Sequence, residues 1–127
     1  MQLVAQRDVR PLYGQIVAQD AETADLPDWE SGDEQAVASG HAVVIATRPD
    51  HVGNVHIQVL RGGGGADLGS QVFDGALEVV SGRLLVGSVL GGQLIEVETG
   101  GTGYVPIRVF VQPVELPERV TVVLGLA

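Results

Sequence analysis

Short runs in which apolar and polar residues alternate recur along the whole chain. In residues 54–60, for example, Val55, Ile57 and Val59 alternate with polar side chains, and a period of two is typical of a strand with one buried face. Similar runs, bounded by Gly, Pro, Asn, Asp or Ser, return at intervals of about 8 to 12 residues. They predict strands over residues 11–20, 41–47, 54–60, 72–80, 83–89, 94–98, 104–112 and 120–124.

The number and spacing of these runs predict an all-β fold, a two-sheet antiparallel β-sandwich of about eight short strands. Residues 41–47 are apolar on both faces, which indicates a central strand. Because proline cannot donate to a ladder, Pro106 predicts a free edge or a bulge inside its strand. No segment has a sustained 3.6-residue period, although residues 31–39 could form one or two helical turns. The length predicts one domain spanning residues 1–127.

The charge of the chain narrows the choice of partners. The formal net charge is −9, and the basic residues are all arginine. Nucleic acids and anionic membranes attract basic surfaces. The composition therefore argues against both of these partners and favours a basic protein.

The chain contains no cysteine. A disulfide, a thiolate metal site and a thiol nucleophile are therefore excluded. The N-terminal residues do not resemble a signal peptide, and no apolar run approaches the roughly 18 residues that span a bilayer. We expect a cytoplasmic location.

Residues 20–34, DAETADLPDWESGDE, differ from the rest of the chain and are called the acidic loop below. They hold seven of the 16 acidic residues, no basic residue and the only tryptophan. The pattern places them between the first and second expected strands. This segment is the one part of the sequence that does not resemble scaffold.

Three interpretations of the acidic loop are open. It could bind calcium through Asp28, Glu30, Asp33 and Glu34, although their spacing is not that of an EF-hand. It could be a solubilising loop. It could also be a protein-interaction surface whose carboxylates imitate the phosphates that a basic partner binds. Trp29 would then anchor the interface, unless it folds back and plugs one end of the sandwich.

No combination of side chains in the sequence predicts catalysis. The histidines lack a clustered carboxylate that would complete a metal site, and no serine or threonine lies in a nucleophile motif. The glycines of residues 62–65 precede a strand, whereas a phosphate loop precedes a helix. Carboxylate pairs such as Glu96 and Glu98 share the outward face of a strand. The three histidines that were considered as metal ligands are His41, His51 and His56. We predict a non-enzymatic protein with no cofactor and no metal site.

Several short motifs, taken in order, resemble the ComJ-like competence nuclease-inhibitor family of small bacterial β-sandwich proteins. The most specific are a Y-x-Q motif, Tyr13 to Gln15, and the D-W pair Asp28 and Trp29. Weaker matches follow in the same order, and together they extend from about residue 12 to residue 123: residues 36–40, 72–73, 77–82, 84–88 and 103–109.

The resemblance implies a β-sandwich that binds and inhibits a secreted or membrane-linked DNA nuclease and has no catalytic residues of its own. A nuclease groove that holds phosphate is basic, so the acidic loop would suit it. The alternative is a small-ligand-binding or structural module, which a closed apolar pocket between the sheets would favour. On the first hypothesis, the interaction residues are Glu22, Asp25, Asp28, Trp29, Glu30, Asp33 and Glu34.

Overall fold

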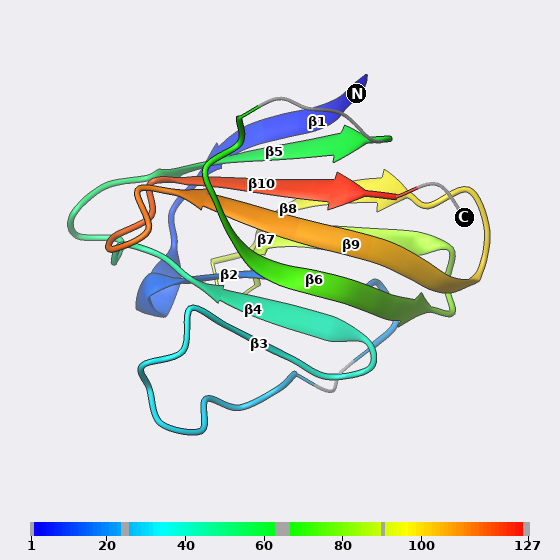
Figure 1. Ribbon diagram of the computed structural model, residues 1–127, viewed down its shortest axis with the longest axis horizontal. Coiled ribbons are helices and arrows are strands. Elements are labelled where there is room, and N and C mark those ends of the chain that lie inside the picture. The colour runs from blue at the N-terminus through cyan, green and yellow to red at the C-terminus, as the bar shows by residue number, and fades with distance from the viewer. Residues whose placement is uncertain (1, 24–25, 63–66, 90, 126–127) are drawn as a thin grey trace.

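The computed structural model of the protein is built from two packed β-sheets (Figure 1). The structure describes residues 2–23, 26–62, 67–89 and 91–125. Sheet A has the strand order β1-β5-β10-β9-β6, and sheet B has the order β3-β4-β2-β7-β8. The strands are β1 (Gln2–Val9), β2 (Gln15–Asp20), β3 (Ala36–Ala38), β4 (Ala42–Ala46), β5 (Val55–Arg61), β6 (Ser70–Val79), β7 (Arg83–Ser88), β8 (Gln93–Glu98), β9 (Gly103–Gln112) and β10 (Arg119–Leu124).

This architecture confirms the predicted all-β, two-sheet sandwich. The described residues form ten strands, rather than about eight. Paired strands are antiparallel except for β5 and β10, which run parallel. Strands β1 and β3 were not expected from the sequence, and the acidic loop therefore lies between the second and third strands instead of the first and second. The helical turns considered for residues 31–39 are wrong, because Ala36–Ala38 pair with β4.

The core lies between the sheets and is formed by the inward residues of the alternating strands. Val55, Ile57 and Val59 of β5 are fully buried, as their alternation predicts. The strand expected at residues 41–47 is also central, since β4 lies between β3 and β2. The core is aliphatic: Val, Ile, Leu and Ala supply all its fully buried members, while Phe73 packs against it from a half-buried position.

Pro106 lies in an interior strand, because β9 has β10 on one side and β6 on the other. The ladder shows no bulge at this residue, which pairs with Ala76 of β6. The Pro106 carbonyl accepts a hydrogen bond from the Gly125 N–H at 2.8 Å. In an antiparallel ladder the N and the C=O of one residue face the same neighbour. The position where Pro106 lacks an N–H therefore faces the end of β10. No carbonyl group within the sheet loses its hydrogen-bond donor as a result.

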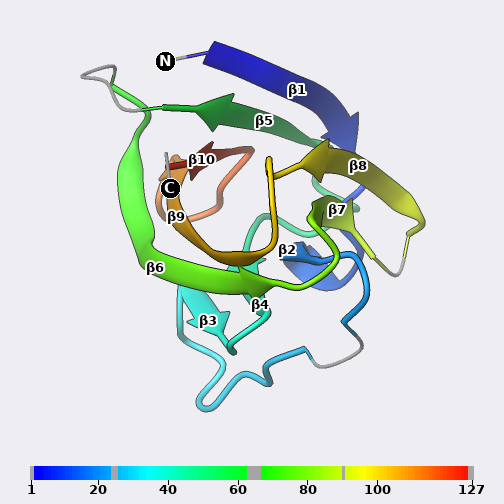
Figure 2. The ribbon, with the colours of Figure 1, turned by 90° about the vertical axis from the view of Figure 1, so that its right-hand side faces the viewer.

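Contacts between the sheets close both long sides of the sandwich (Figure 2). On one side, the Arg7 guanidinium of β1 donates to the Leu94 carbonyl of β8 at 3.2 Å. On the other side, the Glu78 N–H of β6 donates to the Gly40 carbonyl at 2.7 Å. The described chain contains no helix that is long and apolar enough to cross a membrane.

Candidate interaction site at one end of the sandwich

The acidic loop runs along the whole length of strand β2. It leaves β2 at Asp20, returns along the outside of sheet B, and turns into β3 at the end of the sheet where β2 begins, with β4 between β3 and β2 (Figure 1). Five residue steps separate Gln15 from Asp20, and these correspond to roughly 17 Å of extended chain. The carboxylates that are crowded in the sequence are therefore divided between two ends of the molecule.

Asp20 and Glu22 lie at one end and are engaged with the scaffold. Asp20 is 1% exposed, and its Oδ1 accepts hydrogen bonds from the Ser81 N–H at 3.1 Å and the Ser81 hydroxyl at 2.5 Å. Burial alone would raise the pKa of Asp20, but these hydrogen bonds outweigh it and the pKa is lowered. Glu22 is exposed and lies close enough to Arg83 to contribute to its raised pKa. These two residues therefore do not belong to the surface at the Trp29 end of the loop.

At the other end, Trp29 folds back onto sheet B. Its indole Nε1–H donates to the Gln15 side-chain oxygen at 3.2 Å, and the ring is partly buried. Beside it lies a hollow of about 170 Å³, which we call the Trp29 hollow and which Tyr13, Gly14 and Ala46 also line. The two most specific motifs of the sequence, Y-x-Q and D-W, therefore meet in space through Gln15 and Trp29.

Glu34 gives the loop its shape. Its carboxylate accepts hydrogen bonds from three successive backbone N–H groups, those of Glu30 at 3.0 Å, Ser31 at 2.7 Å and Gly32 at 3.0 Å. These bonds, led by the one from Ser31, lower the pKa of Glu34. Glu34 thus holds the turn of the loop together. Its predicted role as a contact residue stays a prediction.

Three of the predicted contact carboxylates remain exposed around this folded turn: Asp28, Glu30 and Asp33. Among the described residues, no ion pair engages any of them. Asp25 lies outside the described residues. The acidic surface at the Trp29 end therefore consists of three carboxylates on a turn that is held by Glu34 and by the Trp29–Gln15 hydrogen bond.

Tyr13 belongs to this site and was not singled out as a contact residue from the sequence. It lies in a short 3-10 turn (Leu12–Gly14) before β2, has a φ of 62°, and is 81% exposed. A bulky residue rarely adopts a positive φ, and residues that do so are concentrated at functional sites. Its place in the Y-x-Q motif was the one available signal.

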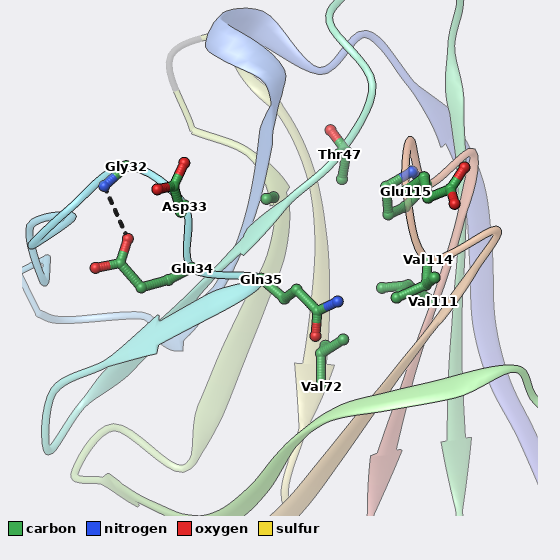
Figure 3. Close-up of a pocket in the computed structure, with 11 residues that line it drawn as sticks. Gly32, Asp33, Glu34, Gln35, Thr47, Val72, Val111, Val114 and Glu115 are labelled. Carbon is green, nitrogen blue, oxygen red and sulfur yellow. Dashed lines mark hydrogen bonds between the residues drawn. The ribbon is translucent and has the colours of Figure 1, made fainter.

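A second hollow, of about 270 Å³, lies between the acidic loop and the loop that joins β9 to β10. Figure 3 shows Asp33 and Glu34 on one side of it, Val114 and Glu115 on the other, and the Gln35 side chain between them. We call it the Gln35 hollow. It adjoins the Trp29 hollow, because Glu34 lines both.

Two of the three histidines, His41 and His56, are held by polar contacts, and His51 is exposed. His56 Nδ1 lies 2.7 Å from Asp8 Oδ1, and its Nε2 lies 3.2 Å from Gln6 Oε1. His41 contacts Glu78, with Nδ1 2.9 Å from the Glu78 carbonyl. His56 also lines a polar hollow of about 310 Å³. In the described part of the chain, no three His, Cys, Asp or Glu side chains gather in a way that could hold a metal ion.

The hollows bear on the alternative of a small-ligand module. Each of the three is open to solvent and is lined partly or wholly by polar loop residues. None of these three is a closed apolar pocket between the sheets, which is the feature that would favour that alternative.

The fold and this end of the molecule together define a two-sheet β-sandwich that presents an ordered acidic turn. No protein-family model matches the sequence, and no curated protein sequence is similar to it. Among solved structures, the chain is similar to ComJ from Bacillus subtilis, described as the inhibitor of the DNA degrading activity of NucA. The TM-score is 0.78 over 99% of this chain and 98% of ComJ, at 10% sequence identity. The resemblance predicted from the motifs is thus confirmed for the fold.

Proposed function

We propose that this protein is a non-enzymatic binding protein that inhibits a DNA nuclease by docking on the nuclease's basic groove. The docking surface would consist of Asp28, Glu30 and Asp33, together with Tyr13 and Trp29. The observation that carries the proposal is the ordered turn itself: three exposed carboxylates on a backbone that Glu34 holds through three hydrogen bonds. The ComJ-like fold supports it, because ComJ inhibits a nuclease.

Order matters because a preformed surface loses little conformational entropy when it binds. Glu34 fixes the backbone of residues 30–32. The hydrogen bond from Trp29 to Gln15 fixes the loop just before this turn to strand β2. The exposed carboxylates are therefore carried by an ordered backbone. Carboxylates in fixed positions can replace DNA phosphates in a basic groove and speed the encounter electrostatically.

Tyr13 would supply the apolar part of the contact. It is 81% exposed and lines the Trp29 hollow with Trp29 itself. Tyrosine and tryptophan are enriched among the residues that dominate binding energies at protein interfaces. An aromatic pair ringed by carboxylates fits a basic protein surface better than it fits a nucleic acid.

The test is to capture the partner and measure its enzymatic activity. Immobilised protein is incubated with extract and culture medium of the organism that encodes it, and the retained fraction is assayed for DNA degradation. We expect the wild type to retain a DNA-degrading enzyme. The Asp28→Asn/Glu30→Gln variant should bind it at least about tenfold more weakly, since two interfacial charges together contribute about 1.4 kcal/mol or more.

The matched control is Asp74→Asn/Glu98→Gln, which removes the same net charge from exposed positions on β6 and β8. It should bind as the wild type does. Equal losses in the two variants would mean that total charge, rather than the acidic turn, attracts the partner. A retained fraction without DNA-degrading activity would contradict the proposed function.

A further inference from the structure

The geometry points to the Gln35 hollow as the receptor for one long basic side chain, lysine or arginine, of the partner protein. This inference rests on the proposed function and adds the chemical nature of the partner group. The hollow shares Asp33 with the three exposed carboxylates but does not involve Asp28 or Glu30. Its other walls include residues of the β9–β10 loop and the start of β6.

The floor and one wall of the hollow are apolar. Val72 of β6 and Val111 of β9 line it, and Val114 and Pro117 of the β9–β10 loop complete this side. Val111 is 2% exposed, whereas Val114 is 38% exposed at the rim. Lysine and arginine carry three or four methylene groups that pack on apolar surface while the charged head stays near water. The wall offers such a surface to the stem of the side chain.

The rim of the hollow is negative. Asp33, Glu34 and Glu115 line it, and no basic residue does. Asp33 and Glu115 are exposed and free to turn toward a ligand. The hydrogen bonds from the backbone N–H groups keep Glu34 ionised. A cationic head at the rim would face three carboxylates and could donate to the Gln35 side-chain oxygen as well.

The size of the hollow fits a side chain better than a free cofactor. Its volume is about 270 Å³, while pockets for small molecules usually range from about 300 to 1,000 Å³. Figure 3 shows the Gln35 side chain lying between the two walls, where it can meet a group that enters the hollow. One side chain entering from a bound surface would fill it.

Short peptides test the hollow without a nuclease. Acetyl-Gly-Arg-Gly-amide is titrated into isotopically labelled protein, and the NMR signals of the Gln35 amide and the Val114 methyls are followed. The lysine peptide tests the other basic head, and the citrulline peptide keeps the stem but lacks the charge. We expect millimolar binding of a basic peptide at these signals, and binding of the citrulline peptide at least threefold weaker.

Two variants distinguish binding in the Gln35 hollow from general electrostatic attraction to the acidic protein. Asp33→Asn/Glu115→Gln removes the rim charges and should weaken basic-peptide binding about three- to tenfold. Val114→Phe keeps every charge but places a bulkier ring at the rim of the hollow, and it should reduce the signal changes at Gln35. Thermal unfolding checks that both variants fold, and Asp74→Asn/Glu98→Gln again serves as the control.

The outcomes distinguish this inference from the proposed function. Equal binding of the arginine and citrulline peptides, or unchanged binding by Val114→Phe, would overturn the inference while inhibition through Asp28 and Glu30 stands. Full nuclease inhibition by Val114→Phe would also overturn the inference, because the partner would then not use the Gln35 hollow. Loss of inhibition in Val114→Phe, with Asp28 and Glu30 intact, would support it.

Discussion

Replacing Tyr13 by asparagine separates what this residue does for stability from what it does for binding. Tyr13 has a φ of 62° and is 81% exposed. Asparagine is among the few residues that adopt a positive φ readily. The Tyr13→Asn variant should therefore fold as well as the wild type or better, while losing the aromatic contact with the partner.

The magnitude follows from two opposing terms. About a fifth of the Tyr13 surface is covered, which corresponds to roughly 40 Å² if a buried tyrosine covers about 200 Å², or about 1 kcal/mol of lost burial. Relief of the left-handed backbone conformation returns about 1–2 kcal/mol. We expect the free energy of unfolding to stay equal or to rise by up to about 1 kcal/mol, which raises Tm by at most about 4 °C.

The assay combines thermal unfolding with inhibition of DNA degradation. Inhibition by Tyr13→Asn should be about tenfold weaker or more, as for an aromatic residue at the centre of an interface. The control is Tyr104→Asn, since Tyr104 is 70% exposed and lies roughly 24 Å along β9 from Val111. Tyr104→Asn should keep full inhibition and lose up to about 1 kcal/mol, because asparagine is a poor strand former. A loss of more than about 2 kcal/mol in Tyr13→Asn, or unchanged inhibition, would refute the reasoning.

Two further predictions concern the buried and bridging carboxylates. Hydrogen bonds hold the pKa of Glu34 below its ordinary value of 4.5, so its contribution to loop order is complete above pH 4.5 and is lost as pH falls through the folded pKa. Fluorescence of Trp29, the only tryptophan, should change as pH falls below 4.5, and Glu34→Gln should show the acid value at neutral pH. A wild-type signal that stays flat until the whole protein unfolds in acid would contradict this. Asp20→Asn places an amide against the Ser81 donors and should lower the free energy of unfolding, measured in urea, by about 1–3 kcal/mol. The control Asp74→Asn, at an exposed position, should change it by less than about 0.5 kcal/mol. Equal effects of the two variants would contradict the role of Asp20.

The strands that the sequence predicts are those with a buried face that repeats every second residue. Val105, Ile107 and Val109 are of this kind, and all three are buried. Strand β1 has no such repeat: Leu3 and Val4 are exposed, and only Val9 at its end is fully buried. Its pairing with β5 depends on the backbone ladder, which leaves no periodic signal in the side chains. Strand β3 has three residues, too few to show a period.

The candidate site was predictable in composition but not in arrangement. The crowding of carboxylates around Trp29 predicted a loop here, and residues 26–34 form no strand. It could not show that Asp20 is buried against Ser81 or that Glu34 binds its own loop. The contact of Asp20 with Ser81 is made by the turn after β6, which is distant in the sequence, and the bonds of Glu34 are local contacts within the loop. The return of the loop along β2 is likewise a feature of the tertiary structure. The same return brings Trp29 to Gln15 and turns two separate motifs into one site.

The central claim is that the exposed carboxylates of the acidic turn carry the inhibition of a DNA nuclease. The most direct measurement is the rate of DNA degradation by the captured nuclease, titrated with wild type, Asp28→Asn/Glu30→Gln and the control Asp74→Asn/Glu98→Gln. We expect the wild type and the control to give the same inhibition curve, and the Asp28→Asn/Glu30→Gln curve to move to at least about tenfold higher concentration, with a weaker dependence on salt. A wild-type protein that leaves the rate unchanged, or three superimposed curves, would contradict the account.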